Sequence, residues 1–200
     1  MRPIIIDLDG VLVDFNLPFW HVLAAQGAPM IPFENGEPRT WHWEALYGAS
    51  SAHVDAAWAQ VAEDPVWWAE LPKHTDVAKA DLHWWHGAVG RPVIYCSARP
   101  HQVLSGSEWW LHDHVCEAVP TLLHAPGPQR KPRVLQGLSP VAILEDKWDT
   151  LAICARKIAT GEMDPCRLLL VDRPYNHAAP HPMIERVAST PAALKLVEAL

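Results

Sequence analysis

The sequence predicts an α/β fold in which an open parallel sheet carries a small helical cap inserted after the first strand. Short, continuous apolar runs alternate with helical stretches, and this is typical of parallel strands buried on both faces. A third observation predicts the cap. About 85 residues separate the first two apolar runs, whereas a crossover between parallel strands needs only about a dozen.

The first strand is expected over residues 2–7, where Ile4-Ile5-Ile6 runs into Asp7. Four later apolar runs have the same form and predict strands at 92–96, 121–124, 141–144 and 167–171. Helical stretches lie between them at 107–118, 131–136 and 147–159. Because the strands are parallel, their carboxyl ends should meet at one edge of the sheet, which is where open α/β sheets bind ligands.

The long interval after the first strand contains several helical pieces. They are expected at 17–26, 40–47, 52–62, 66–70 and 75–87. The last can serve as the crossover helix to the second strand, so the others form the insertion. We therefore expect a core domain of residues 1–15 and 73–200, with a helical cap of residues 16–72 above the carboxyl ends of the strands.

Composition limits the class of protein. The 16 basic and 23 acidic residues give a net charge of −7, which argues against a broad nucleic-acid footprint but leaves a local anion site possible. No apolar run approaches the roughly 20 residues that span a bilayer, and no secretory signal is recognisable. The four cysteines form no CxxC pair and are expected as reduced thiols, which favours the cytoplasm. The sequence does not determine the oligomeric state, and a homodimer is one of the states that it allows.

Two aspartates leave the first strand, in the segment Asp7-Leu8-Asp9-Gly10. An ionised carboxylate at position 7 can attack phosphorus without a general base. Asp9 could protonate the leaving oxygen and later activate water. Gly10 allows a tight turn that brings backbone close to a ligand. The same residues could form only a polar turn. A calcium loop of the EF-hand type would need an oxygen ligand where Val11 stands.

Candidates for phosphate binding follow the later strands. The hydroxyl of Ser97 and free backbone N–H groups, such as that of Ala98, can hold a phosphate oxygen, although Ser97 could also be an ordinary loop serine. A lysine at the site would offset the charges of Asp7 and the phosphate. Lys131 is our candidate, with Arg130 and Lys147 as competitors, and a solvated basic turn is the other interpretation.

An acidic group follows the strand predicted at 141–144. Attack of a carboxylate on a phosphate brings two anions together, so a divalent cation must neutralise the charge. Mg²⁺ prefers oxygen ligands in octahedral geometry. We expect Asp7, Asp9 and Asp146 as its ligands, with a backbone carbonyl of the loop among the oxygens. Glu145 is expected to contact the metal ligands, or to bind the metal through a water molecule, instead of binding it directly. Asp149 is instead favoured as a first-turn residue of the following helix.

Together these residues resemble the haloacid dehalogenase superfamily of phosphohydrolases. The first motif of that superfamily, Asp-x-Asp-Gly-x-Leu, is present at residues 7–12. Its second-motif Ser/Thr matches Ser97, its basic third motif matches Lys131, and its acidic pair matches Glu145 and Asp146. The resemblance spans nearly the whole chain and implies the Rossmann-like parallel sheet of that superfamily (the HAD fold) with a cap after the first strand.

Within the superfamily, three segments are similar to the 5'(3')-deoxyribonucleotidase branch. They are residues 9–15 (Asp-Gly-Val-Leu-Val-Asp-Phe), 67–72 (Trp-Trp-Ala-Glu-Leu-Pro) and 171–176 (Val-Asp-Arg-Pro-Tyr-Asn). That branch removes phosphate from nucleoside monophosphates and holds the base against aromatic residues of the cap and first loop. Phe15 matches the aromatic residue after the first motif and is the implied base contact.

The resemblance implies a Mg²⁺-dependent phosphatase that works through an aspartyl-phosphate and acts on nucleoside monophosphates. Another phosphatase of the superfamily, for a different small phosphorylated metabolite or a polynucleotide end, is the first alternative. A non-enzymatic phospho-acceptor domain of the receiver type is the second. Receiver domains carry their acceptor aspartate after the third strand and have no such cap, which weighs against them.

The chain has 11 tryptophans, and several lie in the expected cap. Any of them could stack on a nucleobase, because every base offers a π-face. A small helical cap also needs bulky side chains for its own core, and for a single tryptophan this is the simpler interpretation. The tryptophans in question are Trp41, Trp43, Trp58, Trp67 and Trp68.

Overall fold

The computed structural model describes residues 1–29, 48–116, 120–176 and 180–200. Its centre is a six-stranded sheet in which every neighbouring pair is parallel. The strand order is β3-β2-β1-β4-β5-β6, which confirms the predicted α/β class. The strands are β1 (Ile4–Ile6), β2 (Val93–Ser97), β3 (Thr121–His124), β4 (Ala142–Glu145), β5 (Arg167–Val171) and β6 (Ile184–Val187).

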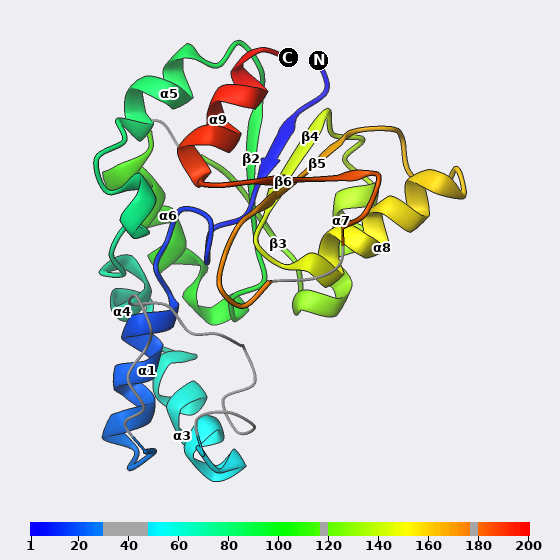
Figure 1. Cartoon of the computed structure of the whole chain (residues 1–200). Helices are drawn as coiled ribbons and strands as arrows, with labels where there is room; N and C mark the ends of the chain where they lie inside the picture. The colour runs from blue at the N-terminus through cyan, green and yellow to red at the C-terminus, as the bar shows by residue number, and fades with distance from the viewer. Residues whose placement is uncertain (30–47, 117–119, 177–179) are drawn as a thin grey trace.

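Helices cover both faces of the sheet, and this explains the apolar runs. In Figure 1, α5, α6 and α9 lie to one side of the sheet, and α7 and α8 lie to the other. Ile4 and Ile6 of β1 belong to one hydrophobic core cluster, whereas Ile5 belongs to the second cluster. A strand between two helical layers must be apolar at every position. The helices are α5 (Leu82–Ala88), α6 (Leu104–His114), α7 (Lys131–Gln136), α8 (Trp148–Ala159) and α9 (Thr190–Glu198).

The insertion after β1 contains α1 (Asn16–Ala25), α3 (Ser51–Val61) and α4 (Pro65–Ala69). Each begins one residue before the predicted helix. Figure 1 shows α1 and α3 beyond the carboxyl ends of the strands, on the side away from the chain termini. The predicted helix 40–47, with Trp41 and Trp43, lies outside the described residues.

Three features differ from the prediction. The single crossover helix expected at 75–87 is wrong, because the segment is split into the 3₁₀ turn η1 (Thr75–Val77) and α5. Asp81 causes the break, since its side chain accepts a hydrogen bond from the Trp84 N–H at 2.8 Å and caps a new helix. The sequence prediction also lacked β6 and α9. Two further 3₁₀ turns, η2 (His101–Val103) and η3 (Pro128–Arg130), precede α6 and α7.

The two chain segments that enter and leave the insertion are hydrogen-bonded to each other. The Asp14 N–H donates to the Pro72 carbonyl at 2.9 Å, and the His74 N–H donates to the Leu12 carbonyl at 2.8 Å. Between these bonds, Val13 and Lys73 form an antiparallel bridge. Entry and exit therefore form one short two-stranded connection.

The exit of the insertion also packs tightly on the core. A Cβ atom on Gly106 of α6 would lie 2.0 Å from the Pro65 carbonyl oxygen of α4, so only glycine fits there. The Trp110 indole N–H donates to the Leu71 carbonyl at 2.7 Å. These contacts fix α4 against α6.

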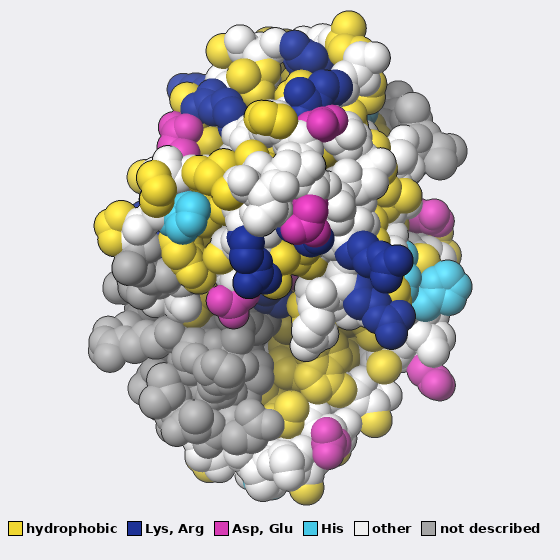
Figure 2. All heavy atoms as spheres, turned by 90° about the vertical axis from the view of Figure 1, so that its right-hand side faces the viewer, with side chains coloured by type: hydrophobic (Ala, Val, Ile, Leu, Met, Phe, Trp, Pro, Cys, Tyr) yellow, Lys and Arg dark blue, Asp and Glu magenta, His cyan; other side chains and the backbone are white. Residues whose placement is uncertain are grey.

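Each of the two adjacent tryptophan pairs on the core helices has one buried and one exposed member. Trp85 and Trp110 are buried, whereas Trp84 and Trp109 are exposed. Figure 2 views the molecule from the side of α7 and α8, where Lys, Arg, Asp and Glu side chains are interspersed over the core and hydrophobic side chains show below them. Among the described residues, no helix has the length and apolar character that a membrane span requires.

Candidate active site

The loop after β1 is shaped by a tight turn. The Leu8 carbonyl accepts hydrogen bonds from the N–H groups of the three residues 11–13, at 2.8 to 3.2 Å. Gly10 has φ +79°, which favours glycine. A Cβ atom there would also lie 2.2 Å from Asp146 Oδ2 and 2.5 Å from the Tyr175 hydroxyl oxygen. Gly10 therefore lets the loop approach the end of β4 closely.

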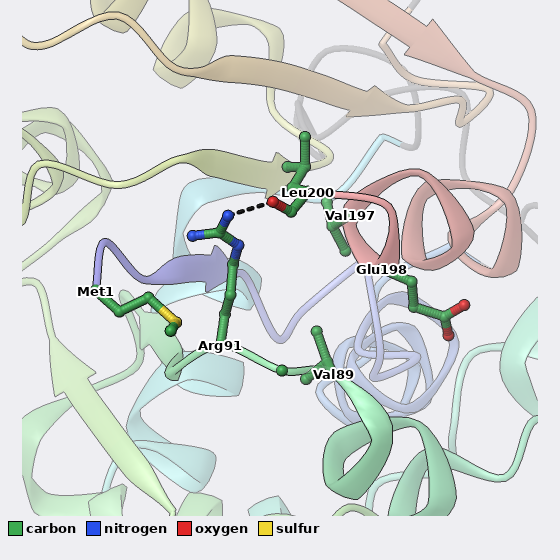
Figure 3. Close-up of a pocket in the computed structure, with 7 residues that line it drawn as sticks. Met1, Val89, Arg91, Val197, Glu198 and Leu200 are labelled. Carbon is green, nitrogen blue, oxygen red and sulfur yellow. Dashed lines mark hydrogen bonds between the residues drawn. The ribbon is translucent and has the colours of Figure 1, made fainter.

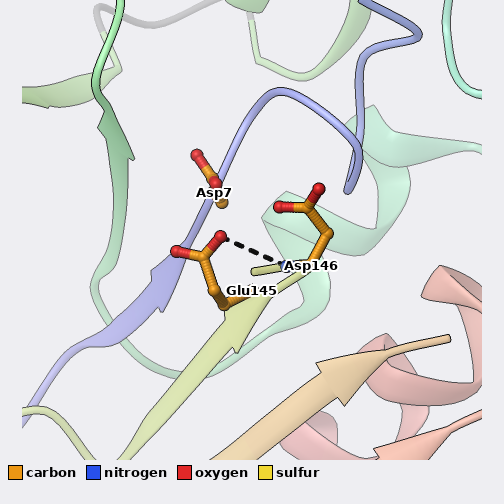
Figure 4. Close-up of side chains that lie close together, drawn as sticks. All are labelled: Asp7, Glu145 and Asp146. Atoms are coloured by element: carbon orange, nitrogen blue, oxygen red, sulfur yellow. Dashed lines mark hydrogen bonds between the residues drawn. The ribbon is translucent and has the colours of Figure 1, made fainter. Parts of the chain in front are cut away.

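Three buried carboxylates meet at the carboxyl edge of the sheet. Asp7 follows β1, and Glu145 and Asp146 stand at the end of β4, which pairs with β1 in the register Ile6 to Leu144. One ligand oxygen from each lies within 4.8 Å of the others, and Figure 4 shows them converging from the two strand ends. The structure thus brings together three of the four acids that the sequence singled out, namely Asp7, Glu145 and Asp146.

Lys131 supplies the positive charge of the cluster. Its ammonium nitrogen lies 2.6 Å from Asp7 Oδ2 and 2.8 Å from Glu145 Oε2, and its side chain is 4% exposed. It reaches the site from the first residue of α7. Of the two competitors, Arg130 is exposed and Lys147 is half-buried.

Two of the three carboxylates, Asp7 and Glu145, share the Lys131 ammonium group, and the pKa values reflect the crowding of acids. Burial and the neighbouring charge of Glu145 raise the pKa of Asp7, although Lys131 opposes the shift. Burial and the charge of Asp7 likewise raise the pKa of Asp146. Burial alone would lower the pKa of Lys131, but the charges of Asp7 and Glu145 outweigh it and raise that pKa. The cluster therefore has an excess of buried negative charge.

A divalent cation fits this donor set. Asp146 Oδ1 is buried and has no hydrogen-bond partner among the described residues, although a buried carboxylate oxygen normally has one. Hard cations such as Mg²⁺ take oxygen ligands and favour ionised carboxylates. Asp7 and Asp146 would hold the ion, and a carbonyl of the loop at Asp9 would add the third oxygen. The carboxylate of Glu145 instead contacts the Lys131 ammonium group. It also accepts hydrogen bonds from the N–H groups of Asp146 and Lys147, both at 3.2 Å.

The carboxylate of Asp9 is not among the three that converge in this cluster. Its carboxylate is paired with Arg99, whose Nη2 is 2.7 Å from Oδ1, and its side chain remains 20% exposed. An aspartate that is reachable from solvent suits a group that exchanges protons with a substrate or water. Arg99, however, was not among the residues predicted for the site.

Ser97 ends β2, which pairs with β1 at the same edge of the sheet. The residue is fully buried, and its hydroxyl oxygen accepts a hydrogen bond from the Arg99 N–H at 3.1 Å. A serine hydroxyl can also donate its hydrogen, and the predicted contact of Ser97 with a phosphate oxygen remains a prediction. Ala98 is half-buried, and the predicted role of its N–H group remains a prediction.

Phe15 lies within an aromatic cluster of the insertion. Its ring stacks on Phe19, Trp58 and Trp68 at centroid distances of 5.0, 5.6 and 5.4 Å. Phe15 itself is only 3% exposed, whereas Trp58 is 36% exposed. The cluster serves first as the core of the insertion. Contact between Phe15 and a substrate stays a prediction.

The loop after β5 contributes residues to which the sequence analysis gave no role. The Tyr175 hydroxyl donates to Asp146 Oδ2 at 2.6 Å, and the Asn176 amide donates to the Asp146 carbonyl at 2.7 Å. Arg173 Nε donates to the Gly10 carbonyl at 2.7 Å. This loop therefore holds both the Asp146 carboxylate and the turn after Asp7. The only sequence signal was the Pro-Tyr-Asn segment, which carried no assigned function.

Replacing Tyr175 by Phe is expected to weaken Mg²⁺ binding by about tenfold, because partners of this kind orient a ligand at a cost of roughly 10- to 100-fold in affinity. Isothermal titration of metal-free protein with MgCl₂ measures this without reference to activity. Tyr95→Phe is the matched control, since that buried hydroxyl contacts His86 instead, at 2.8 Å. Equal Mg²⁺ affinities for the two variants would contradict the assignment of Tyr175.

A separate hollow lies near the two chain termini. Figure 3 shows it between the segment before β2 and the end of α9, where Arg91 donates to the Leu200 carbonyl. It lies at the amino ends of the strands, opposite the carboxylate cluster, and it is lined by Met1, Val89, Gly90, Arg91, Val197, Glu198 and Leu200. We do not include it in the candidate site.

Comparison with solved structures gives the relationship of the fold, whereas no protein-family model and no curated protein matches the chain. A haloacid dehalogenase-like hydrolase from Streptococcus pneumoniae is 14% identical, with a TM-score of 0.61 and 98% of both chains covered. A HAD-superfamily hydrolase of subfamily IA from Geobacter sulfurreducens is 16% identical, with a TM-score of 0.54 and coverage of 98% of this chain and 99% of that one.

An L-2-haloacid dehalogenase is 15% identical over 98% of this chain and 99% of its own, with a TM-score of 0.55. All three similarities extend over essentially the whole chain, including the helices between β1 and β2. Identities this low carry information about architecture and not about substrate. The chain therefore has the fold of the haloacid dehalogenase-superfamily hydrolases.

Proposed function

We propose that this protein is a Mg²⁺-dependent phosphatase that hydrolyses phosphomonoesters through an aspartyl-phosphate on Asp7. The observation that carries the proposal is the buried cluster at the carboxyl edge of the sheet. There, Asp7 is paired with Lys131 beside Asp146, whose Oδ1 has no partner in the part of the chain that the structure describes. Such a cluster joins a nucleophile to a cation site at the edge where open α/β sheets bind ligands.

In the first step, a carboxylate oxygen of Asp7 attacks phosphorus, and the bond between phosphorus and the ester oxygen breaks. Asp9 gives its proton to that oxygen, so the alcohol leaves neutral. When bound, Mg²⁺ neutralises charge between the phosphate and the carboxylates. Lys131, 2.6 Å from Asp7 Oδ2, offsets the same charge from the other side.

In the second step, water attacks the phosphorus of the aspartyl-phosphate while Asp9 takes up a proton from it. The bond between phosphorus and the Asp7 oxygen breaks, which releases inorganic phosphate and restores the carboxylate. The hydroxyl of Ser97 and the N–H of Ala98 would hold the non-bridging oxygens through both steps. The proton that Asp9 gives to the leaving oxygen in the first step is recovered from water in the second, so no net proton is consumed by the protein.

Dehalogenation is the competing chemistry, because one similar structure is an L-2-haloacid dehalogenase. A halide leaves without a proton, and displacement at carbon needs no cation beside the nucleophile. Dehalogenation would therefore need neither Asp9 as a proton donor to the leaving group nor a cation ligand at position 146, whose Oδ1 has no hydrogen-bond partner among the described residues. These two residues favour phosphoryl transfer.

We further propose that the substrate is a nucleoside monophosphate, as the resemblance to the 5'(3')-deoxyribonucleotidases implies. The aromatic cluster of the insertion supports this. Trp58 stacks on Phe15, which follows the loop after β1, and Trp58 remains partly exposed. Aromatic side chains hold bases by stacking, at about 1–3 kcal/mol per base. A phosphorylated metabolite without a base would not use this interaction.

A substrate panel tests both parts of the proposal. With Mg²⁺ present, kcat/KM for 5'- and 3'-deoxyribonucleoside monophosphates is expected to exceed that for sugar phosphates by about tenfold or more, the value of one stacked base. Phosphate release is the measurement, and EDTA should abolish it. Chloride release from L-2-chloropropionate without phosphate release would reject the phosphatase. A preference for sugar phosphates, or for a DNA 3'-phosphate end, would reject only the nucleotide substrate.

A further inference from the structure

Among the described residues, the carboxylate of Asp9 contacts one side chain, that of Arg99. Arg99 Nε lies 3.2 Å from Asp9 Oδ1 and 3.0 Å from Oδ2, while Arg99 Nη2 lies 2.7 Å from Oδ1. A guanidinium that contacts both oxygens through two nitrogens fixes the plane of the carboxylate as well as its position. A lysine, as a point charge, would not fix that plane.

Arg99 is itself held from several sides. Its Nη1 donates to the Ser107 hydroxyl of α6 at 2.9 Å, and its guanidinium carbon lies 4.7 Å from the centroid of the Trp68 ring of α4. Its backbone N–H donates to Ser97 Oγ, and its carbonyl is 2.8 Å from His124 Nε2. Arg99 is therefore preorganised, and its order does not depend on Asp9 alone.

Exposure separates the roles of the two residues. The Arg99 side chain is 1% exposed, whereas the Asp9 side chain is 20% exposed. A substrate oxygen can therefore reach Asp9, while Arg99 lies behind it. Stacking on Trp68 covers one face of the guanidinium. The geometry thus favours an arginine that acts through Asp9 over an arginine that binds the phosphate itself.

We propose that Arg99 is a positioning residue that holds the carboxylate of Asp9 in the orientation needed for proton transfer to the leaving oxygen. This inference rests on the proposed phosphatase function. Proton transfer requires a donor oxygen within hydrogen-bond reach of the leaving group, and a carboxylate free to rotate would spend little time there. Through its contact with Arg99, Trp68 of the insertion thereby helps to orient Asp9 in the loop after β1.

The leaving group provides a test that a general structural role would not affect. A nitrophenolate leaves without protonation, whereas the alkoxide of a nucleoside monophosphate needs a proton. Arg99→Met is expected to lower kcat/KM for the nucleotide by on the order of 10²-fold, the value of acid catalysis, and for 4-nitrophenyl phosphate by less than about tenfold. Asp9→Asn should show the same selective loss, and the double variant should be no worse than Asp9→Asn.

Arg167→Met is the matched control. Arg167 is the first residue of β5, at the amino ends of the strands and away from the site, and it pairs with Glu185 of β6. This substitution should leave both rates unchanged. Arg99→Lys keeps the charge without the planar contact and should show an intermediate selective loss, which keeps the test informative if Arg99→Met folds poorly. Equal losses on both substrates, or a rise in KM alone, would overturn the proposal.

A second measurement is independent of any activity. Urea unfolding of wild type, Asp9→Asn, Arg99→Lys and the double variant forms a double-mutant cycle. Non-additive losses of stability support the pairing of Asp9 and Arg99. Additive losses overturn it. If the wild type hydrolyses none of the phosphomonoesters, the proposed function fails, and the cycle still decides whether Arg99 holds Asp9.

Discussion

Asp7→Asn is expected to lower kcat by on the order of 10⁴-fold or more, since loss of a nucleophile leaves only the contributions of binding and charge stabilisation. The amide has nearly the same shape as the carboxylate. Its one oxygen can still accept the hydrogen bond from the Leu8 N–H, which is 2.7 Å from Oδ1 in the wild type. The amide NH₂ then faces Lys131, which keeps Glu145 as its partner at 2.8 Å. The loss of activity should therefore not come from unfolding.

The pKa shift of Asp7 predicts the direction in which Asp7→Asn changes the free energy of unfolding. Burial and Glu145 raise the pKa of Asp7 in the folded chain. Folded protein therefore retains a proton at pH values where the unfolded chain has released it, so the free energy of unfolding falls as pH rises above about 4. In EDTA at neutral pH, Asp7→Asn should be at least as stable as the wild type.

Steady-state phosphate release and urea unfolding of the same preparations measure the two effects. Asp149→Asn is the matched control, because that carboxylate is exposed in the first turn of α8, and it should keep wild-type activity. Phosphatase activity retained in Asp7→Asn would falsify the nucleophile assignment, whatever the substrate.

Lys131→Met is expected to destabilise the protein by about 3–5 kcal/mol, the cost of removing one partner from a buried ionic group. The ammonium group is 4% exposed and contacts both Asp7 and Glu145. Without it, the three carboxylates of the cluster have no buried counter-charge from α7. Methionine has a similar length and apolar stem, so the effect reports the lost charge more than a lost volume.

Urea denaturation in EDTA measures this loss, and Arg130→Met provides the control at an exposed neighbouring position, where changes stay within about 0.5 kcal/mol. Adding Glu145→Gln to Lys131→Met should recover part of the stability, because one uncompensated carboxylate is removed. If Lys131→Met costs no more than Arg130→Met, the buried pairing does not hold the cluster.

The sequence was most informative at the ends of the central strands. Ile4, Ile5 and Ile6 must be apolar because both faces of β1 are covered, and an acid at the end of such a run can only lie at the rim. The same logic placed Glu145 and Asp146 beside Asp7, since parallel neighbours end at one edge. Lys131 was harder to assign, because a basic cluster in a turn gives no sign of which member points inward.

β6 shows why an edge strand escaped prediction. Only its end residues Ile184 and Val187 are buried, and the two residues between them are exposed and charged. Glu185 pairs with Arg167, and Arg186 pairs with Asp172. A four-residue strand stabilised by such pairs has no apolar run, and its position depends on pairing with β5 and on packing of Ile184 and Val187 into the core.

Arg99 and Tyr175 escaped prediction for a different reason. Each acts through a partner far away in the sequence, since Arg99 contacts Asp9 and Tyr175 contacts Asp146. Local pattern and propensity contain no information on such pairs, because the fold brings the partners together. The proposed nucleophile and metal ligands follow from strand ends, whereas the residues proposed to orient them follow only from three-dimensional packing.

The paired connection between core and insertion has a consequence for how the protein can change. The Asp14 N–H bonds to the Pro72 carbonyl, so the two ends of the insertion stay adjacent whatever lies between them. Each doubling of an inserted segment adds only about 0.6 kcal/mol of closure entropy. The sequence between these ends is therefore open to lengthening, shortening or exchange, and new substrate preferences can evolve while the aspartate loop keeps its geometry.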